Sequence, residues 1–128
     1  MTLIARFTVD GADPHTLDGF EAPWVGIMVF RKTFLSGLVG EATTVFLAAG
    51  TEEGSRSYVA TERITGRTDD GRQGSFTVQH GGLESEPDSW FGHIVPKTGT
   101  DDFAAWAGSA RIVHDDEGAF FEIELVSP

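Results

Sequence analysis

Apolar and polar residues alternate along most of the chain, which is the pattern of half-buried β-strands. The clearest case lies between positions 57 and 82, where two segments rich in β-branched and aromatic residues flank Asp69-Asp70-Gly71. A glycine at the third position of a three-residue loop suits the left-handed residue of a bulged hairpin. The predicted register contains the opposite pairs Ile64–Phe76, Glu62–Val78 and Ala60–His80.

An acid and an imidazole share the apolar face of this hairpin. In the predicted register Glu62 and His80 are diagonal neighbours, about 7–8 Å apart at the backbone. A two-residue loop at Asp70-Gly71 would instead place Glu62 opposite Gln79 and mix apolar with polar residues on each face. We therefore prefer the bulged register. A slip by one residue would put Gln79 inside in place of His80.

Strand signals recur in the rest of the sequence. We expect a first strand at 3–9, whereas residues 10–23 are too polar and too rich in Gly, Pro and Asp for a regular element. The remaining predicted elements are a hairpin of 25–35 and 38–48 that turns at Ser36-Gly37, a strand at 89–95, one helical turn at 101–107, and a hairpin of 109–114 and 119–126. This all-β pattern of eight antiparallel strands favours a closed up-and-down barrel, with a two-sheet sandwich as the alternative.

Length and composition narrow the range of functions. The 128 residues are expected to form one domain with a core of its own. The net charge of −11 argues against nucleic acid and against an acidic membrane surface as partners. The absence of cysteine excludes disulfides and thiolate chemistry. The first apolar run is too short for a signal peptide, so we expect a cytoplasmic protein.

Four segments resemble a bacterial family called domain of unknown function 3224 (DUF3224), whose barrels are similar to allene oxide cyclase. They occur in the family's order and are KTFLSGLVGEATTVFL (32–47), YVATERITG (58–66), GRQGSFTVQHGG (71–82) and VPKTGTDDFAAWAGSARI (95–112). The resemblance implies an eight-stranded antiparallel barrel with a central cavity. Related barrels include plant allene oxide cyclase and bacterial enzymes that close rings in polyketides. Family members usually carry a Gly-Ser pair where this chain has Lys97-Thr98, so no specific substrate is carried over.

Glu62 is the first candidate for chemistry. Burial in an apolar lumen raises the pKa of a carboxyl group, so Glu62 is predicted to serve as a general acid or base. The alternative is a carboxylate that is simply paired with a cation or with backbone donors, the commoner state of a buried charge. His80 beside it could relay a proton or bond a substrate carbonyl. A hydrogen-bonded structural histidine is the alternative there.

A second candidate pair lies in the preceding hairpin. With a turn at Ser36-Gly37, Lys32 and Glu41 are predicted to face each other among apolar neighbours, where they could anchor or activate a polar substrate group. An ordinary cross-strand salt bridge is the alternative. The four histidines lack ligand spacing, so no metal site is predicted. No motif calls for a cofactor.

Aromatic residues complete the predicted site. The expected lumen and ligand contacts are Phe7, Phe30, Phe34, Tyr58, Phe76, Trp90 and Phe121. A barrel of this size is either packed solid or just wide enough for one small ligand. The sequence favours a cofactor-independent cyclase or isomerase whose partner is a small apolar molecule, and the resemblance suggests polyketide-type compounds among its substrates. The alternatives are a non-catalytic barrel that binds a small hydrophobic ligand and a structural subunit of a homo-oligomer.

Overall fold

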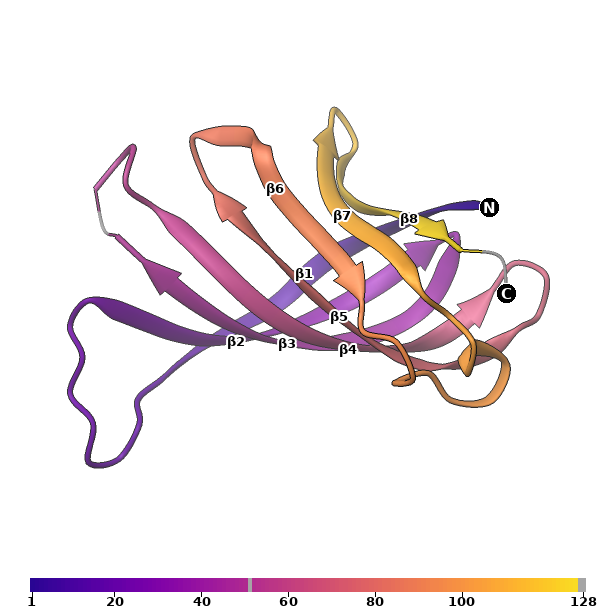
Figure 1. The fold of residues 1–128 in the computed structure, drawn as a ribbon, viewed down its shortest axis with the longest axis horizontal. Coiled ribbons are helices and arrows are strands. Elements are labelled where there is room, and N and C mark those ends of the chain that lie inside the picture. Colours follow the sequence, from indigo (N-terminus) through magenta and orange to yellow (C-terminus); the bar gives the residue numbers. More distant parts are fainter. Residues whose placement is uncertain (51, 127–128) are drawn as a thin grey trace.

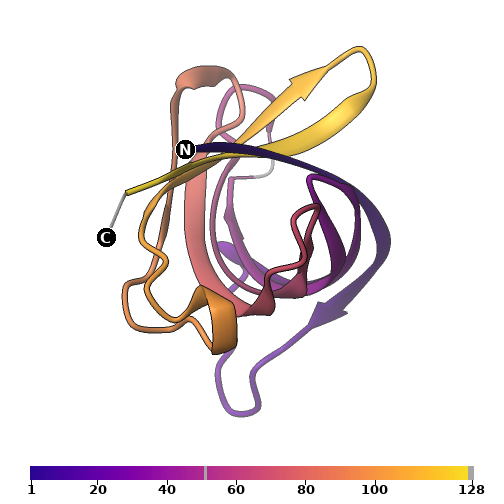
Figure 2. The ribbon, with the colours of Figure 1, turned by 90° about the vertical axis from the view of Figure 1, so that its right-hand side faces the viewer.

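The computed structural model describes residues 1–50 and 52–126, and their strands form a closed barrel (Figure 1). Within these residues the strands are β1 (Thr2–His15), β2 (Val25–Ser36), β3 (Leu38–Ala49), β4 (Ser57–Thr68), β5 (Gln73–Leu83), β6 (Glu86–Ile94), β7 (Gly108–Asp115) and β8 (Gly118–Leu125). Each strand pairs antiparallel with the next, and β8 closes on β1, beside which it lies in Figure 2. The predicted up-and-down barrel is confirmed, and the sandwich alternative is wrong.

The hairpin of β4 and β5 has the predicted register. All three expected pairs are present, namely Ile64–Phe76, Glu62–Val78 and Ala60–His80. Gly71 has a φ of 86°, in the left-handed region that glycine adopts without a steric cost. Because side chains alternate across a strand, this register directs Glu62 and His80 to the inside of the barrel, where both are buried.

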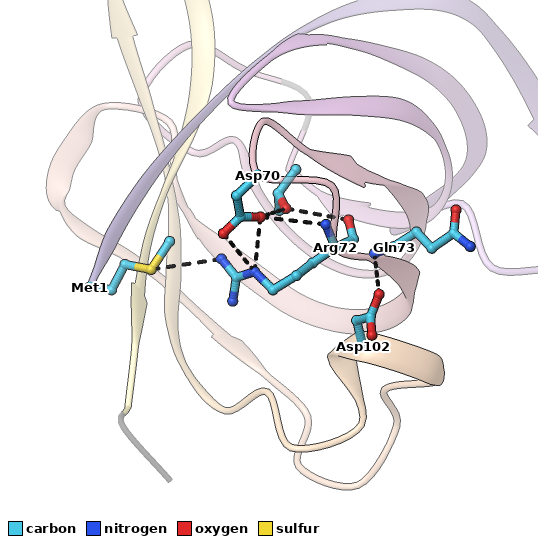
Figure 3. A network of polar contacts seen from close by, with 6 residues as sticks. Met1, Asp70, Arg72, Gln73 and Asp102 are labelled. Carbon is cyan, nitrogen blue, oxygen red and sulfur yellow. Dashed lines mark hydrogen bonds and ion pairs between the residues drawn. The ribbon is translucent and has the colours of Figure 1, made fainter.

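A polar network holds the turn between β4 and β5 (Figure 3). Asp70 accepts hydrogen bonds from the hydroxyl of Thr68 and from Nε of Arg72, the latter at 3.0 Å. These bonds lower the pKa of Asp70 to about 2, and the bond from Thr68 makes the largest contribution. The guanidinium of Arg72 also reaches Sδ of Met1 at 3.8 Å, which connects the turn to the start of β1.

The segment between β6 and β7 packs against the same end of the barrel. It contains the 3₁₀ turn η1 (Asp101–Phe103), within the range predicted to be helical. Asp102 accepts a hydrogen bond from the backbone N–H of Gln73 at 2.9 Å. The buried rings of Phe103 and Trp106 stack with centroids 3.9 Å apart, and Phe103 meets Phe76 edge to face. This aromatic group fills the end of the barrel near the β4–β5 turn.

β1 is longer than the sequence predicts. It runs on to His15, because the backbone beyond Val9 pairs with residues 27–31 of β2 after an irregularity between Val9 and Gly11. Its side chains from 12 to 15 are exposed, so no apolar alternation marks this part of the strand. Residues 16–24 then form a loop that projects away from the barrel (Figure 1).

The predicted register between β2 and β3 is wrong by one residue. Only Gly37 separates the two strands, with a φ of 75°, and this tighter turn pairs Lys32 with Ala42 and Thr33 with Glu41. A shift of one residue moves every side chain of a strand to the other face of the sheet. Glu41 therefore lies on the exposed outer surface, and it does not face Lys32.

Candidate functional site

The lumen is filled differently at its two ends. The half nearest the β4–β5 turn is packed with buried apolar side chains, among them Leu38, Ile64, Phe76, Ile94, Phe103, Ala110 and Ile123. The other half contains a group of polar side chains that we call the polar cluster, consisting of Lys32, Thr44, Tyr58, Glu62 and His80. The polar cluster holds the buried charges of the lumen, so it is the candidate site.

Glu62 is the centre of the polar cluster. Its Oε1 accepts a hydrogen bond from Nζ of Lys32 at 2.8 Å and lies 2.9 Å from Nε2 of His80. The other ring nitrogen of His80, Nδ1, lies 2.9 Å from the hydroxyl of Tyr58. The exposed fractions of Lys32, Glu62 and His80 are 4%, 0% and 2%, so water does not screen these contacts.

The chemistry of the groups fixes which of them donates and which accepts in each hydrogen bond of the polar cluster. A carboxylate only accepts, so Nε2 of His80 donates to Glu62, and in a neutral imidazole Nδ1 then accepts the proton of the Tyr58 hydroxyl. Three strands supply the residues of this hydrogen-bonded series: β4 carries Tyr58 and Glu62, β5 carries His80, and β2 carries Lys32. The ammonium group of Lys32 also lies 4.3 Å from the ring centroid of Phe7, in a cation–π contact.

The partners of Glu62 reverse the predicted direction of its pKa shift. Burial alone raises the pKa of this carboxyl group, but the hydrogen bond from His80 and the charge of Lys32 outweigh burial and hold the pKa below its ordinary value. The predicted rise is therefore wrong, because the sequence did not reveal that Lys32 of β2 reaches Glu62 of β4 across the intervening strand β3. Glu62 is a carboxylate paired with the ammonium group of Lys32 and hydrogen-bonded by the ring of His80.

Burial shifts the pKa values of Lys32 and Tyr58 in directions that favour hydrogen-bond donation. It lowers the pKa of Lys32, and the attraction of Glu62 opposes this only in part. It also raises the pKa of Tyr58 to about 12, with a further contribution from the negative charge of Glu62. Tyr58 therefore keeps its proton at neutral pH, while the Lys32 ammonium is a stronger acid than an exposed lysine.

A cavity of about 200 Å³ adjoins the polar cluster. It is lined by Phe7, Val9, Phe30, Lys32, Thr44, Phe46, Tyr58, His80, Trp90, Ile112, His114 and Ala119. Of the seven aromatic residues expected from the sequence, four lie in this lining, namely Phe7, Phe30, Tyr58 and Trp90. The other three, Phe34, Phe76 and Phe121, are fully buried core residues outside the lining. Aromatic side chains therefore form the walls of the cavity, and members of the polar cluster form its base.

Two buried polar atoms of the polar cluster have no hydrogen-bond partner within the described part of the chain. They are Oγ1 of Thr44 and Oε2 of Glu62, and the two residues form a directly opposite pair of β3 and β4. Buried polar atoms in proteins are nearly always hydrogen-bonded. Thr44 lines the cavity, so its buried hydroxyl lies beside the space that a bound molecule would fill.

Sequence reasoning missed Thr44 and Phe46 because the β2–β3 register was wrong. Both residues alternate with exposed neighbours on β3 and face inward in the true register. A turn formed by Gly37 alone, in place of the two-residue turn at Ser36-Gly37, would have given the correct register and identified both residues. His114 was also missed as a cavity residue, although its strand was predicted. It lies edge to face with Trp90, with ring centroids 5.5 Å apart.

Among residues 1–50 and 52–126, no three His, Cys, Asp or Glu side chains are grouped as a metal ion would require. In that same part of the chain, no helix has the length and apolarity needed to cross a membrane.

Comparison with known proteins places the chain among barrels without an assigned activity. Residues 3–125 match the model of a family described as "Protein of unknown function (DUF3224)". The chain is similar to the crystal structure of a DUF3224-family protein of unknown function from Shewanella oneidensis MR-1. The two share 28% sequence identity and a TM-score of 0.80, over 100% of this chain and 98% of that one. No curated protein matches the chain.

Proposed function

The chain belongs to the DUF3224 family, whose description assigns no function, and we propose that it is a proton-transferring isomerase or cyclase acting on a small molecule in the cavity. The observation that carries the proposal is the buried chain from Tyr58 through His80 to Glu62 and Lys32, at the base of an aromatic-walled cavity. Ionisable groups with shifted pKa values at the base of an apolar cavity are typical of active sites.

Lys32 is the group best placed to polarise a substrate oxygen. Its ammonium has three N–H donors, of which Glu62 accepts one, and its side chain lines the cavity. A substrate carbonyl beside Lys32 would develop negative charge as a proton leaves the neighbouring carbon. A fixed cation in a site that excludes water stabilises such an enolate. The lowered pKa of Lys32 strengthens the hydrogen bond that it donates.

Tyr58 and His80 supply the route for the proton. In the proposed step the Tyr58 oxygen takes a proton from the substrate carbon while its own proton passes to Nδ1 of His80. The resulting imidazolium is stabilised by the carboxylate of Glu62 on its other nitrogen. Return of the proton to a different carbon completes an isomerisation. Alternatively, the enolate carbon attacks a second carbonyl carbon of the same molecule, the C–O π bond of that carbonyl breaks, and its oxygen takes back the proton from His80 through Tyr58, which completes a ring closure.

The test is catalysis of proton transfer in a panel of small β,γ-unsaturated ketones, cyclic and open-chain. Conversion to the conjugated isomer is followed by ultraviolet absorbance, and exchange with heavy water by NMR. We expect the wild type to exceed buffer, and Glu62→Gln and Tyr58→Phe to lose about 10²-fold or more of that rate. The exposed variant Glu41→Gln is the matched control and should keep the full rate. Equal rates of proton transfer in wild type and Glu62→Gln would contradict the proposal.

A non-catalytic ligand-binding barrel is the second candidate, and one observation favours it. Oε1 of Glu62 is held by both Lys32 and His80, which is also the arrangement of a purely structural buried ion pair. In that case the ketones bind without proton exchange. Binding is then weakened when an aromatic wall residue such as Phe30 is truncated.

A further inference from the structure

We propose that the cavity binds a molecule of one six-membered ring that carries a carbonyl, enol or phenol oxygen, held between Nζ of Lys32 and Oγ1 of Thr44. The inference rests on the proposed function for the location of the site and names the class of ligand that the site takes. It concerns binding, so it can be tested without a reaction.

The volume of the cavity sets the size of the part of the ligand that the cavity surrounds. At about 200 Å³ it is smaller than the range of about 300–1,000 Å³ in which drug-sized ligands bind. It is somewhat larger than an engineered apolar cavity of about 150 Å³ that takes up benzene. One ring with a small substituent matches this volume. A fused-ring or long polyene substrate of the polyketide type exceeds this volume and would have to extend out of the cavity into solvent.

The unpartnered hydroxyl of Thr44 indicates the polar group of the ligand. Thr44 is fully buried, lines the cavity, and has an Oγ1 without a hydrogen-bond partner in the described part of the chain. Leaving such a group unsatisfied costs free energy, which a ligand oxygen at hydrogen-bonding distance removes. Glu62 also has an unpartnered oxygen, but it is not among the lining residues, so Thr44 makes the contact.

Lys32 is the second donor to the same ligand oxygen. Thr44 lies opposite Phe30, and Lys32 lies opposite Ala42, so Lys32 and Thr44 are diagonal neighbours on the inner face of β2 and β3. Diagonal neighbours are about 7–8 Å apart at the backbone, a separation that one oxygen atom can bridge when one of the side chains is a lysine. Two donors that converge on one oxygen select an acceptor such as a ketone, enol or phenol.

The walls of the cavity suit a flat ring. Phe46 lies between two other rings, with its centroid 4.9 Å from that of Phe30 and 4.8 Å from that of Tyr58. Trp90 and His114 form a second aromatic pair in the lining. Aromatic side chains offer rigid apolar surfaces against which a planar ring can stack or place its edge.

The test compares phenol, cyclohexenone and toluene as probes of nearly equal size. Binding to the intact protein is measured by NMR titration of the backbone amides. We expect phenol and cyclohexenone to bind about five- to tenfold more tightly than toluene, as one or two added hydrogen bonds imply. Thr44→Val keeps the shape of the side chain and removes the hydroxyl. It should weaken the two oxygenated probes about fivefold and leave toluene unchanged.

Thr43→Val is the matched control, because Thr43 is the neighbouring residue of β3 and is exposed on the outer face. It should leave all three affinities unchanged. The inference is overturned if toluene binds as well as phenol, if Thr44→Val weakens all probes equally, or if no probe binds. Circular dichroism confirms that each variant is folded.

The ligand class and the proposed reaction can fail separately. Phenol binding that depends on Thr44, together with proton exchange that survives in Glu62→Gln, supports the ligand class and removes the proposed proton relay. Exchange that depends on Glu62, together with phenol binding that is indifferent to Thr44→Val, supports the relay and overturns the ligand class.

Discussion

The two ends of the barrel lumen are built from the same alternating strands, yet one end is packed with apolar side chains and the other contains a buried charged group beside a cavity. Near the β4–β5 turn, Phe76 packs on Phe103 and Trp106, and the lumen is apolar and filled. At the opposite end Lys32 and Glu62 lie at positions where apolar side chains would complete the core. A packed end of this kind supplies stability, which allows the other end to hold groups that an apolar core would exclude.

The largest expected effect is at the packed end. Phe76→Ala removes a fully buried ring from a well-packed site and should lower the free energy of unfolding by about 4 kcal/mol. Phe30→Ala is the matched variant at the other end. Phe30 lines the existing cavity and is half-buried, so its loss should cost about 1–2 kcal/mol. Urea unfolding measures the free energy of unfolding of both variants. Equal costs would show that the two ends are packed alike.

A smaller effect is expected when the buried ion pair is broken. Lys32→Met keeps the length of the side chain but leaves Glu62 buried without its cation, which should cost about 3 kcal/mol. Adding Glu62→Gln to Lys32→Met removes the unpaired charge and should recover part of that loss. Urea unfolding of the single and double variants gives the coupling between them. A cost below about 1 kcal/mol for Lys32→Met would contradict a buried pair.

The smallest effect is in the pH dependence of stability. The folded pKa of Glu62 lies below its unfolded value, so the unfolded chain binds more protons as the solution becomes acidic. The stability contributed by the Glu62 carboxylate is therefore present above the ordinary pKa of 4.5 and is lost as the pH falls through the folded pKa.

Urea midpoints measured from neutral pH down to about pH 3 give the slope of this loss. Glu62→Gln should lose less stability over that interval than the wild type, whatever its stability at neutral pH. The exposed Glu41→Gln is the control and should follow the wild-type slope. Parallel curves for Glu62→Gln and wild type would contradict the lowered pKa.

The sequence was most informative where local chemistry decides the structure. The loop before Arg72 contains Gly71 at a left-handed position, and the apolar residues on both sides allow one sensible register. That register was enough to place Glu62 and His80 together inside the barrel. The strand pattern and the family resemblance, two of whose four segments lie in this hairpin, both indicated the closed architecture.

The sequence was least informative where the structure depends on distant strands. Gly37 at the β2–β3 turn is compatible with two registers that differ by one residue, and the choice between them decides which residues of β3 face inward. Lys32 meets Glu62 across the width of β3, so no rule for adjacent strands could have paired them. The pKa of Glu62 depends on this contact, and its direction could not be obtained from burial alone.

The contact between β1 and β8 has a consequence for the folding of the protein. Thr2 pairs with Glu124, so the last seam of the barrel joins residues separated by nearly the whole chain. Seams of this kind form late, because the entropy of closing so long a loop must be overcome first. Ala119 of β8 is part of the cavity lining, and the cavity is therefore complete only when that final strand has docked.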